Sequence, residues 1–132
     1  MESFSYHISI DKNLVPEETE IAPMLVQPLV ENAIWHGLRN KEGERRLLIR
    51  FFKDRNRIVC EVEDNGVGLH QALNNRAGSL QNHNSFGIKN IRERLTILNE
   101  KYQMYCSLNI SDKMDLPYQE GSGTLAVLQL SA

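Results

Sequence analysis

Five segments of the chain are predicted to be β-strands, and three of them (4–10, 57–64 and 105–111) alternate apolar and polar residues, the pattern of a strand with one buried face. The five segments are residues 4–10, 46–53, 57–64, 105–111 and 124–130. In the first segment every second residue is apolar, so we expect a half-buried strand. The second and third segments are separated only by Asp54, Arg55 and Asn56, which predicts a tight β-hairpin.

Two segments repeat apolar residues at the three- and four-residue spacing of a helix. In residues 21–37, Pro28 lies in the interior, where it lacks a hydrogen-bond donor and crowds the preceding turn. We therefore expect either a kink in the helix or a restart with this proline at its first position. Gly37 is expected to be the C-cap. The second helix is predicted over residues 85–101.

The order of these elements favours an α+β fold. Strands follow one another as hairpins and do not alternate with helices, as a doubly wound parallel sheet would require. We expect a two-layer α/β sandwich, with helices on one face of a mixed, mostly antiparallel sheet, in a single domain over residues 1–132. The polar stretch 70–84 is long for a connector, and such segments are usually lids or disordered.

Composition and charge narrow the class of protein. The 132 residues are 41% hydrophobic and carry a net charge of −2, with no apolar run long enough for a membrane span and no secretory leader. The near-neutral charge argues against a nucleic-acid-binding arm. Cys60 and Cys106 are far apart, so we expect neither a disulfide framework nor a zinc site, and we interpret Cys60 as a buried thiol.

Asp64 ends its predicted strand and has the same parity as the strand's apolar residues. Its carboxylate is therefore expected to point toward the core or a pocket in it, where it needs hydrogen-bond donors from protein, water or ligand. Gly66 and Gly68 follow, and they let a flat group approach the backbone closely. The alternative interpretation is an aspartate that caps the following turn.

Three further places are candidates for ligand contacts. Asn32 and His36 lie one turn apart on the first predicted helix, where an amide oxygen suits Mg²⁺ and an imidazole suits phosphate; a histidine with a structural role is the alternative. Gly87 lies near the start of the second helix, whose free N–H groups favour phosphate, although plain helix capping is the alternative. Residues 121–124, Gly-Ser-Gly-Thr, open the last strand with a hydroxyl able to share a water with a neighbouring carboxylate.

These candidates occur along the chain in the order Asn32, Asp64, Gly66, Gly68, Gly87, Gly123 and Thr124. This order resembles the nucleotide-binding pattern of the superfamily that contains gyrase, heat-shock-ninety, histidine kinases and mismatch-repair ATPases, the Bergerat fold. Two stretches resemble the LytS/YesM-type sensor histidine kinases more closely. They are Gln-Pro-Leu-Val-Glu-Asn-Ala-Ile-Trp-His-Gly at 27–37 and Phe-Gly-Ile-Lys-Asn-Ile-Arg-Glu-Arg-Leu at 86–95.

The resemblance implies a role for four residues on the adenine side of a nucleotide site. Asp64 would accept a hydrogen bond from the exocyclic amine of adenine. Gly66 and Gly68 would pass beside the adenine and ribose. Thr124 would hold a water next to Asp64.

On the phosphate side, the resemblance implies that Asn32 coordinates Mg²⁺ on the triphosphate. Gly87 and the helix N-terminus after it would hold phosphates, and His36 would reach toward them. The chain departs from the family where many relatives have a lysine and it has Trp35, and where they have a glycine and it has Ser85. Both departures bear on nucleotide affinity.

A third departure concerns the reaction. Pro28 takes the position of the general-base glutamate of the ATP-hydrolysing relatives, which argues against a free-standing ATPase. The resemblance implies the catalytic domain of a two-component sensor kinase, which binds Mg-ATP and donates the γ-phosphate to a histidine. That histidine is expected on an upstream dimerisation helix, so no catalytic residue is expected within these residues.

The partners implied by the resemblance are the upstream helices and a response regulator, with no nucleic acid. The full-length protein is expected to be a homodimer, with this domain on the cytoplasmic side of an inner-membrane sensor. Two alternatives remain open: a degenerate, non-catalytic docking module of the same fold, and an anti-sigma-factor-type serine kinase.

Overall fold

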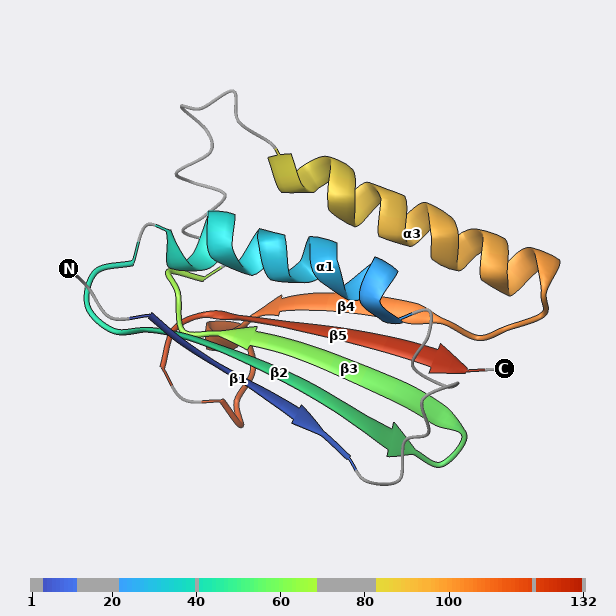
Figure 1. Ribbon diagram of the computed structural model, residues 1–132, viewed down its shortest axis with the longest axis horizontal. Coiled ribbons are helices and arrows are strands. Elements are labelled where there is room, and N and C mark those ends of the chain that lie inside the picture. The colour runs from blue at the N-terminus through green and yellow to red at the C-terminus, as the bar shows by residue number, and fades with distance from the viewer. Residues whose placement is uncertain (1–3, 12–21, 40, 69–82, 120, 132) are drawn as a thin grey trace.

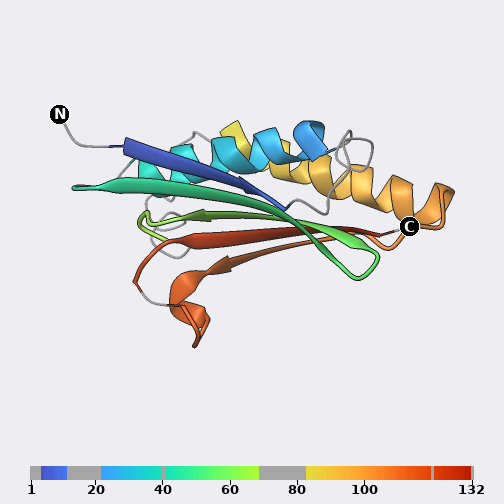
Figure 2. The ribbon, with the colours of Figure 1, turned by 60° about the horizontal axis from the view of Figure 1, so that its bottom comes forward.

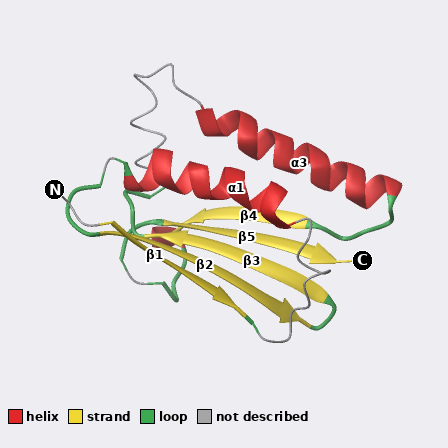
Figure 3. Ribbon diagram, viewed as in Figure 1, coloured by secondary structure: helices red, strands yellow, loops and turns green. Residues whose placement is uncertain are grey.

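A computed structural model of the chain describes residues 4–11, 22–39, 41–68, 83–119 and 121–131. Its elements are β1 (Phe4–Ile10), α1 (Ala22–Asn32), the π-helix η2 (Ala33–Leu38), β2 (Arg45–Asp54), β3 (Arg57–Asp64), α3 (His83–Lys101), β4 (Ser107–Asp112), the 3-10 helix η3 (Lys113–Asp115) and β5 (Thr124–Ser131). Within these residues the strands form one sheet of order β1-β2-β3-β5-β4. Figures 1 and 3 show α1 and α3 side by side on one face of that sheet.

The sheet is mixed and mostly antiparallel. β1 pairs with β2 in parallel, whereas the pairs β2–β3, β3–β5 and β5–β4 are antiparallel. The predicted hairpin joins β2 to β3 through a two-residue turn, in which Arg55 has a positive φ of 59°. The two-layer α+β sandwich predicted from the sequence is therefore confirmed.

The core lies between the helix layer and the sheet, which Figure 2 shows from the side. It is made of buried aliphatic side chains from both helices and from the inner faces of β2 to β5. Leu29 of α1, Ile91 of α3, Val62 of β3 and Leu128 of β5 are all at most 2% exposed. Burial of these faces is the main stabilising contribution, and it fixes the end of β3 beneath the helix layer.

The first strand differs from its prediction. β1 was expected to be half-buried, but all seven of its residues are exposed. Its alternating apolar side chains, Phe4, Tyr6, Ile8 and Ile10, are 49% to 68% exposed. β1 lies at one edge of the sheet, and none of its residues belongs to the core cluster of the described residues. Alternation specifies the strand and its register, but the position of the strand under the helix layer decides its burial, since β4 at the other edge buries Leu108.

The helix does not restart at Pro28, which was one of the two expected outcomes, because α1 runs through the proline. A proline removes one hydrogen bond, and here the burial of Leu25 and Leu29 on either side offsets that loss. Gly37 is not the C-cap: it lies inside η2, which follows α1 directly and has Arg39 as its C-cap. The five-residue hydrogen-bond step of a π-helix is seen at the Arg39 N–H, which donates to the Ile34 carbonyl at 2.8 Å.

Candidate functional site

Asp64 is buried at the end of β3, with 3% of its surface exposed, and faces the helix layer together with Cys60 and Val62. The inward direction predicted from the strand's parity is therefore confirmed. The backbone N–H of Gly66 donates to Asp64 Oδ1 at 2.8 Å, so the aspartate also caps the following turn. Asp64 therefore fits both interpretations drawn from the sequence, a carboxylate that points toward the core and an aspartate that caps the following turn.

The charge state of Asp64 reflects this burial. Burial raises the pKa of the carboxyl from 3.8 to about 6, because a charged group is poorly solvated there. Hydrogen bonds from the backbone of Gly66 and Thr124, and the nearby charge of Lys113, act in the opposite direction. Near pH 7 the carboxylate is ionised but only moderately stabilised, so an additional hydrogen-bond donor would be favoured.

Three glycines allow the backbone to close around Asp64. A Cβ on Gly37 would lie 2.7 Å from Asp64 Oδ1, so η2 approaches the carboxylate as closely as a glycine permits. A Cβ on Gly66 would lie 2.2 Å from the Gly37 carbonyl carbon, and one on Gly123 would lie 1.9 Å from the Asp64 carbonyl oxygen. The chain segments around Asp64 are therefore in direct backbone contact, which explains glycine at each position.

A row of polar residues crosses the sheet at this end. Asp64 of β3 pairs with Thr124 of β5, and Thr124 pairs with Asp112 of β4. Thr124 is 8% exposed and Asp112 is 2% exposed. Asp112 was not predicted, although its parity with Leu108 and Ile110 is the same signal that identified Asp64. The predicted strand ended at residue 111, one residue too early to show it.

Asp112 packs against Gly68, the second glycine of the turn after Asp64. Gly68 has a positive φ of 92°, and a Cβ on it would lie 2.7 Å from Asp112 Oδ2. Asp112 Oδ1 accepts the backbone N–H of Met114 at 2.9 Å, which caps η3. The structure therefore brings Asp64, Gly66, Gly68 and Thr124 together at one end of the sheet.

The structure describes the candidate ligand residues of the first helix, Asn32 and His36, only in part. Asn32 ends α1, is half-buried, and makes no side-chain capping hydrogen bond to η2. Because η2 is a π-helix, the 100° step from Asn32 to His36 assumed for an α-helix does not apply. The side chain of His36 lies outside the described residues. Trp35 is 39% exposed, with the Arg39 guanidinium 4.6 Å from the centre of its ring.

Gly87 lies in the first turns of α3, which begins at His83 and not at residue 85 as predicted. A Cβ on Gly87 would lie 3.0 Å from the Pro28 Cβ, so this glycine lets the two helices approach each other. Residues 69–82, which include most of the predicted lid, lie outside the described residues.

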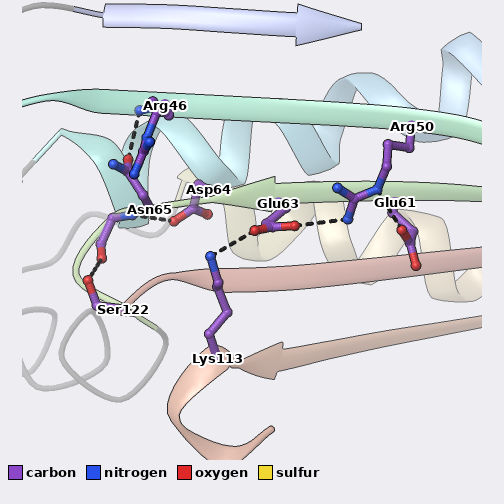
Figure 4. A network of polar contacts seen from close by, with 9 residues as sticks. Arg46, Arg50, Glu61, Glu63, Asp64, Asn65, Lys113 and Ser122 are labelled. Carbon is purple, nitrogen blue, oxygen red and sulfur yellow. Dashed lines mark hydrogen bonds and ion pairs between the residues drawn. The ribbon is translucent and has the colours of Figure 1, made fainter. Parts of the chain in front are cut away.

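The face of the sheet away from the helices carries an ion-pair network, shown in Figure 4. Arg50 contacts Glu61 at 2.8 Å and Glu63 at 2.9 Å, and Lys113 Nζ contacts Glu63 at 2.8 Å. Lys113 is only 6% exposed although it is charged. A hollow of about 530 Å³ adjoins Glu63, Lys113 and Arg46 on this face. This network ties η3 to β3 directly beside Asp64.

Among the described residues, both cysteines are free and buried, and burial raises the pKa of the Cys60 thiol to about 12. The prediction of a buried Cys60 is confirmed. In the same part of the chain no group of three histidine, cysteine or acidic residues lies together as a metal site. Nor is any described helix long and apolar enough to cross a membrane.

The architecture is that of histidine kinase catalytic domains. The histidine kinase domain of the Erythrobacter litoralis EL346 blue-light activated kinase superposes with a TM-score of 0.61 at 18% identity, covering 97% of this chain and 51% of that one. The catalytic domain of the histidine kinase ThkA superposes with a TM-score of 0.55 at 14% identity, covering 97% and 78%. At these identities the likeness shows the fold alone.

Sequence similarity narrows this class further. The sensor protein LytS of Oceanobacillus iheyensis is 32% identical over 111 residues, which is 79% of this chain and 19% of LytS. The sensor histidine kinase YpdA of Escherichia coli is 33% identical over 79 residues, 59% of this chain and 14% of YpdA. No protein-family model matches the sequence. The chain belongs to the LytS-related sensor histidine kinases, and it spans about a fifth or less of the length of these two relatives.

Proposed function

We propose that this domain binds Mg-ATP and supplies the γ-phosphate for phosphorylation of a histidine within a two-component sensor kinase. The observation that carries the proposal is the ionisable carboxylate of Asp64, buried at a sheet end where three glycines bring the backbone into close contact. A carboxylate has about four acceptor positions. Backbone N–H groups of Gly66 and Thr124 account for two of them, which leaves capacity for an amine.

The chemistry of this carboxylate favours adenine over guanine. The exocyclic amine of adenine donates a hydrogen bond, and a donor to an ionised acceptor is a strong interaction. Guanine presents a carbonyl oxygen at the corresponding edge, and two acceptors facing each other in a buried site repel. In this proposal Gly66 and Gly68 lie beside the base and ribose, and Thr124 holds a water next to Asp64.

The triphosphate is assigned to the helix layer. Asn32 offers a half-buried amide oxygen, a type of ligand that Mg²⁺ accepts among its waters. When bound, the metal would neutralise phosphate charge. Gly87 and the N-terminal turn of α3 are proposed to hold phosphates, because N–H groups without partners in the first turn favour anions. His36 is proposed to reach toward the same phosphates.

The transfer step requires positioning more than covalent chemistry from this domain. The bond from the γ-phosphorus to the bridging oxygen of ADP breaks, and a bond to a histidine ring nitrogen forms. We propose that the acceptor histidine lies on a dimerisation helix of the longer protein, that a response regulator then receives the phosphoryl group, and that the whole protein is a homodimer. This chain alone is expected to hydrolyse ATP negligibly.

Calorimetric titration with the ATP analogue AMP-PNP in the presence of Mg²⁺ tests the nucleotide site. We expect saturable binding by the chain and at least about tenfold weaker binding by Asp64→Asn, since a hydrogen bond to a charged acceptor is worth about 1.5–3 kcal/mol. Glu61→Gln is the matched control, because it changes a carboxyl on the other face of the same strand.

The control variant is expected to bind as the unchanged chain does. Absence of saturable binding by the unchanged chain would contradict the proposal and favour the docking module. Equal binding by Asp64→Asn would contradict the adenine assignment alone.

A further inference from the structure

The connection between β4 and β5 holds the turn that follows Asp64 at several points. Ser122 Oγ donates to the Gly66 carbonyl oxygen at 2.8 Å, a contact drawn in Figure 4. Lys113 binds the Glu63 carboxylate, and its backbone N–H donates to the Gly123 carbonyl at 2.9 Å. Lys113 and Ser122 therefore contact the chain on the two sides of Asp64, at Glu63 and at Gly66.

The contact of Ser122 concerns one particular peptide group, the one between Gly66 and Val67. Its carbonyl accepts the Ser122 hydroxyl, and its N–H donates to the Gly37 carbonyl at 3.1 Å. One side of this peptide is thus tied to the segment before β5 and the other side to η2. The preceding peptide carries the N–H of Gly66, which donates to Asp64.

Because Gly66 has no side chain, the orientation of the Gly66–Val67 peptide depends on its contacts with other segments of the chain. A residue without Cβ has several backbone conformations of similar energy, so nothing within Gly66 itself selects the observed one. Rotation of the peptide after Gly66 would turn its carbonyl away from Ser122 and its N–H away from Gly37. The N–H that Gly66 presents to Asp64 belongs to the preceding peptide, which shares the Cα of Gly66 with this one, so a displacement of Gly66 would also disturb the contact with the carboxylate.

We propose that Ser122 is a positioning residue of the adenine site: its hydroxyl holds the Gly66–Val67 peptide in the orientation that keeps Asp64 aligned for the base. This inference rests on the proposed function and extends it to a residue to which no direct contact with the base is assigned. Ser122 is half-buried and lies in a segment 56 residues away along the chain from Gly66.

Three variants of the 132-residue chain separate positioning from plain stability. Ser122→Ala removes the hydroxyl, Ser122→Thr keeps one, and Ser107→Ala removes an exposed hydroxyl at the start of β4 as the control. Titration with AMP-PNP and GMP-PNP, each with Mg²⁺, gives affinity and base preference. The thermal unfolding of each variant is measured in parallel with these titrations.

For Ser122→Ala we expect about three- to tenfold weaker binding of AMP-PNP, the loss of one hydrogen bond, and a smaller preference over GMP-PNP. Ser122→Thr is expected to recover binding to within about twofold. Destabilisation alone does not produce this result, since a protein that remains almost fully folded binds with unchanged affinity. Amide exchange at Val67 is expected to be faster in Ser122→Ala and near normal in Ser122→Thr.

The failures of the two proposals are distinguishable. If Asp64→Asn weakens binding but Ser122→Ala binds and discriminates like the unchanged chain, the role of Ser122 is wrong and the nucleotide site stands. If the unchanged chain does not bind AMP-PNP, the proposed function is wrong and the role of Ser122 in it falls as well. Unchanged exchange at Val67 in Ser122→Ala also contradicts the positioning role.

Discussion

Asp64 and Glu63 are neighbours in β3 with opposite surroundings. Burial raises the pKa of Asp64 to about 6, and the two backbone hydrogen bonds only partly oppose this effect. Burial acts on Glu63 in the same sense, but hydrogen bonds from Lys113 and Arg50 outweigh it and lower its pKa. The strand's alternation sends one carboxyl toward the core and the other toward cationic side chains. Which partners meet each carboxyl depends on segments distant in sequence.

The raised pKa of Asp64 predicts a pH dependence of stability. Between about pH 4 and pH 6 the native state holds a proton on Asp64 that the unfolded chain has lost, so this group lowers the free energy of unfolding as pH rises. The difference between 3.8 and about 6 corresponds to about 3 kcal/mol in total. Above pH 6 the penalty is fully present, and below pH 4 it is absent.

Urea unfolding of the chain and of Asp64→Asn at several pH values checks this. The stability of the unchanged chain relative to the variant is expected to fall by about 2–2.5 kcal/mol from pH 4 to pH 7. Glu63 changes stability in the opposite direction, but both proteins carry it, so its contribution largely cancels in the difference. A difference that stays constant with pH would contradict the assigned pKa.

At the scale of elements, close backbone contact at the end of β3 determines most of the site. Gly66 lies against Gly37, and Gly123 lies against the Asp64 carbonyl, so β3, β5 and η2 meet without intervening side chains. Gly37 lies inside η2, and its carbonyl accepts the Val67 N–H, which ties the π-helix to the turn after β3.

Two glycine variants separate steric contact from backbone strain. Gly66→Ala places a Cβ 2.2 Å from the Gly37 carbonyl carbon and is expected to lower the free energy of unfolding by at least about 3 kcal/mol. Gly43→Ala meets no atom within 4 Å but retains a positive φ of 87°, so we expect a loss of about 1 kcal/mol. Urea unfolding measures both. Equal losses would show that the contact at Gly66 relaxes easily.

The sequence predicted the strands well because alternation is a local property. β3 has its predicted bounds, and β2 and β5 extend only slightly beyond theirs. The predictions were wrong where contacts between segments distant in sequence determine the local structure. Helix α1 passes through Pro28 because its neighbours are buried, and β4 reaches Asp112 because Thr124 pairs with it. Ser122 was included only as part of a turn-like motif, since its partner Gly66 is far away in the chain.

At the scale of the whole molecule, the sheet has one edge that contributes little to the core. Ile8 of β1 is directly paired with Ile49 of β2, yet Ile8 is 49% exposed and Ile49 is 7% exposed. The two residues are of one type and adjacent in one sheet, so the difference arises only from the position of each strand under the helix layer.

This pair predicts unequal losses of stability. Ile49→Ala is expected to lower the free energy of unfolding by about 2–4 kcal/mol, because it leaves a cavity in the core. Ile8→Ala is expected to lower it by about 1 kcal/mol or less, because half of the side chain is already in water. Chemical denaturation of both variants under one set of conditions provides the comparison. A loss at Ile8 equal to that at Ile49 would show that β1 belongs to the core.

The sequence by itself determined the order and type of the elements and the inward direction of Asp64. It also indicated that the two glycines after Asp64 allow close backbone approach. Strand parity and the conformational freedom of glycine are local properties, so both can be predicted from the sequence. The sequence also carried the family resemblance, which similarity to LytS and the shared fold confirm. Tertiary structure alone decided the exposure of β1, the π-helix at Gly37, the row from Asp64 to Asp112 and the contact of Ser122. These depend on which distant segments touch, and contact over long separations leaves no periodic pattern in a single sequence.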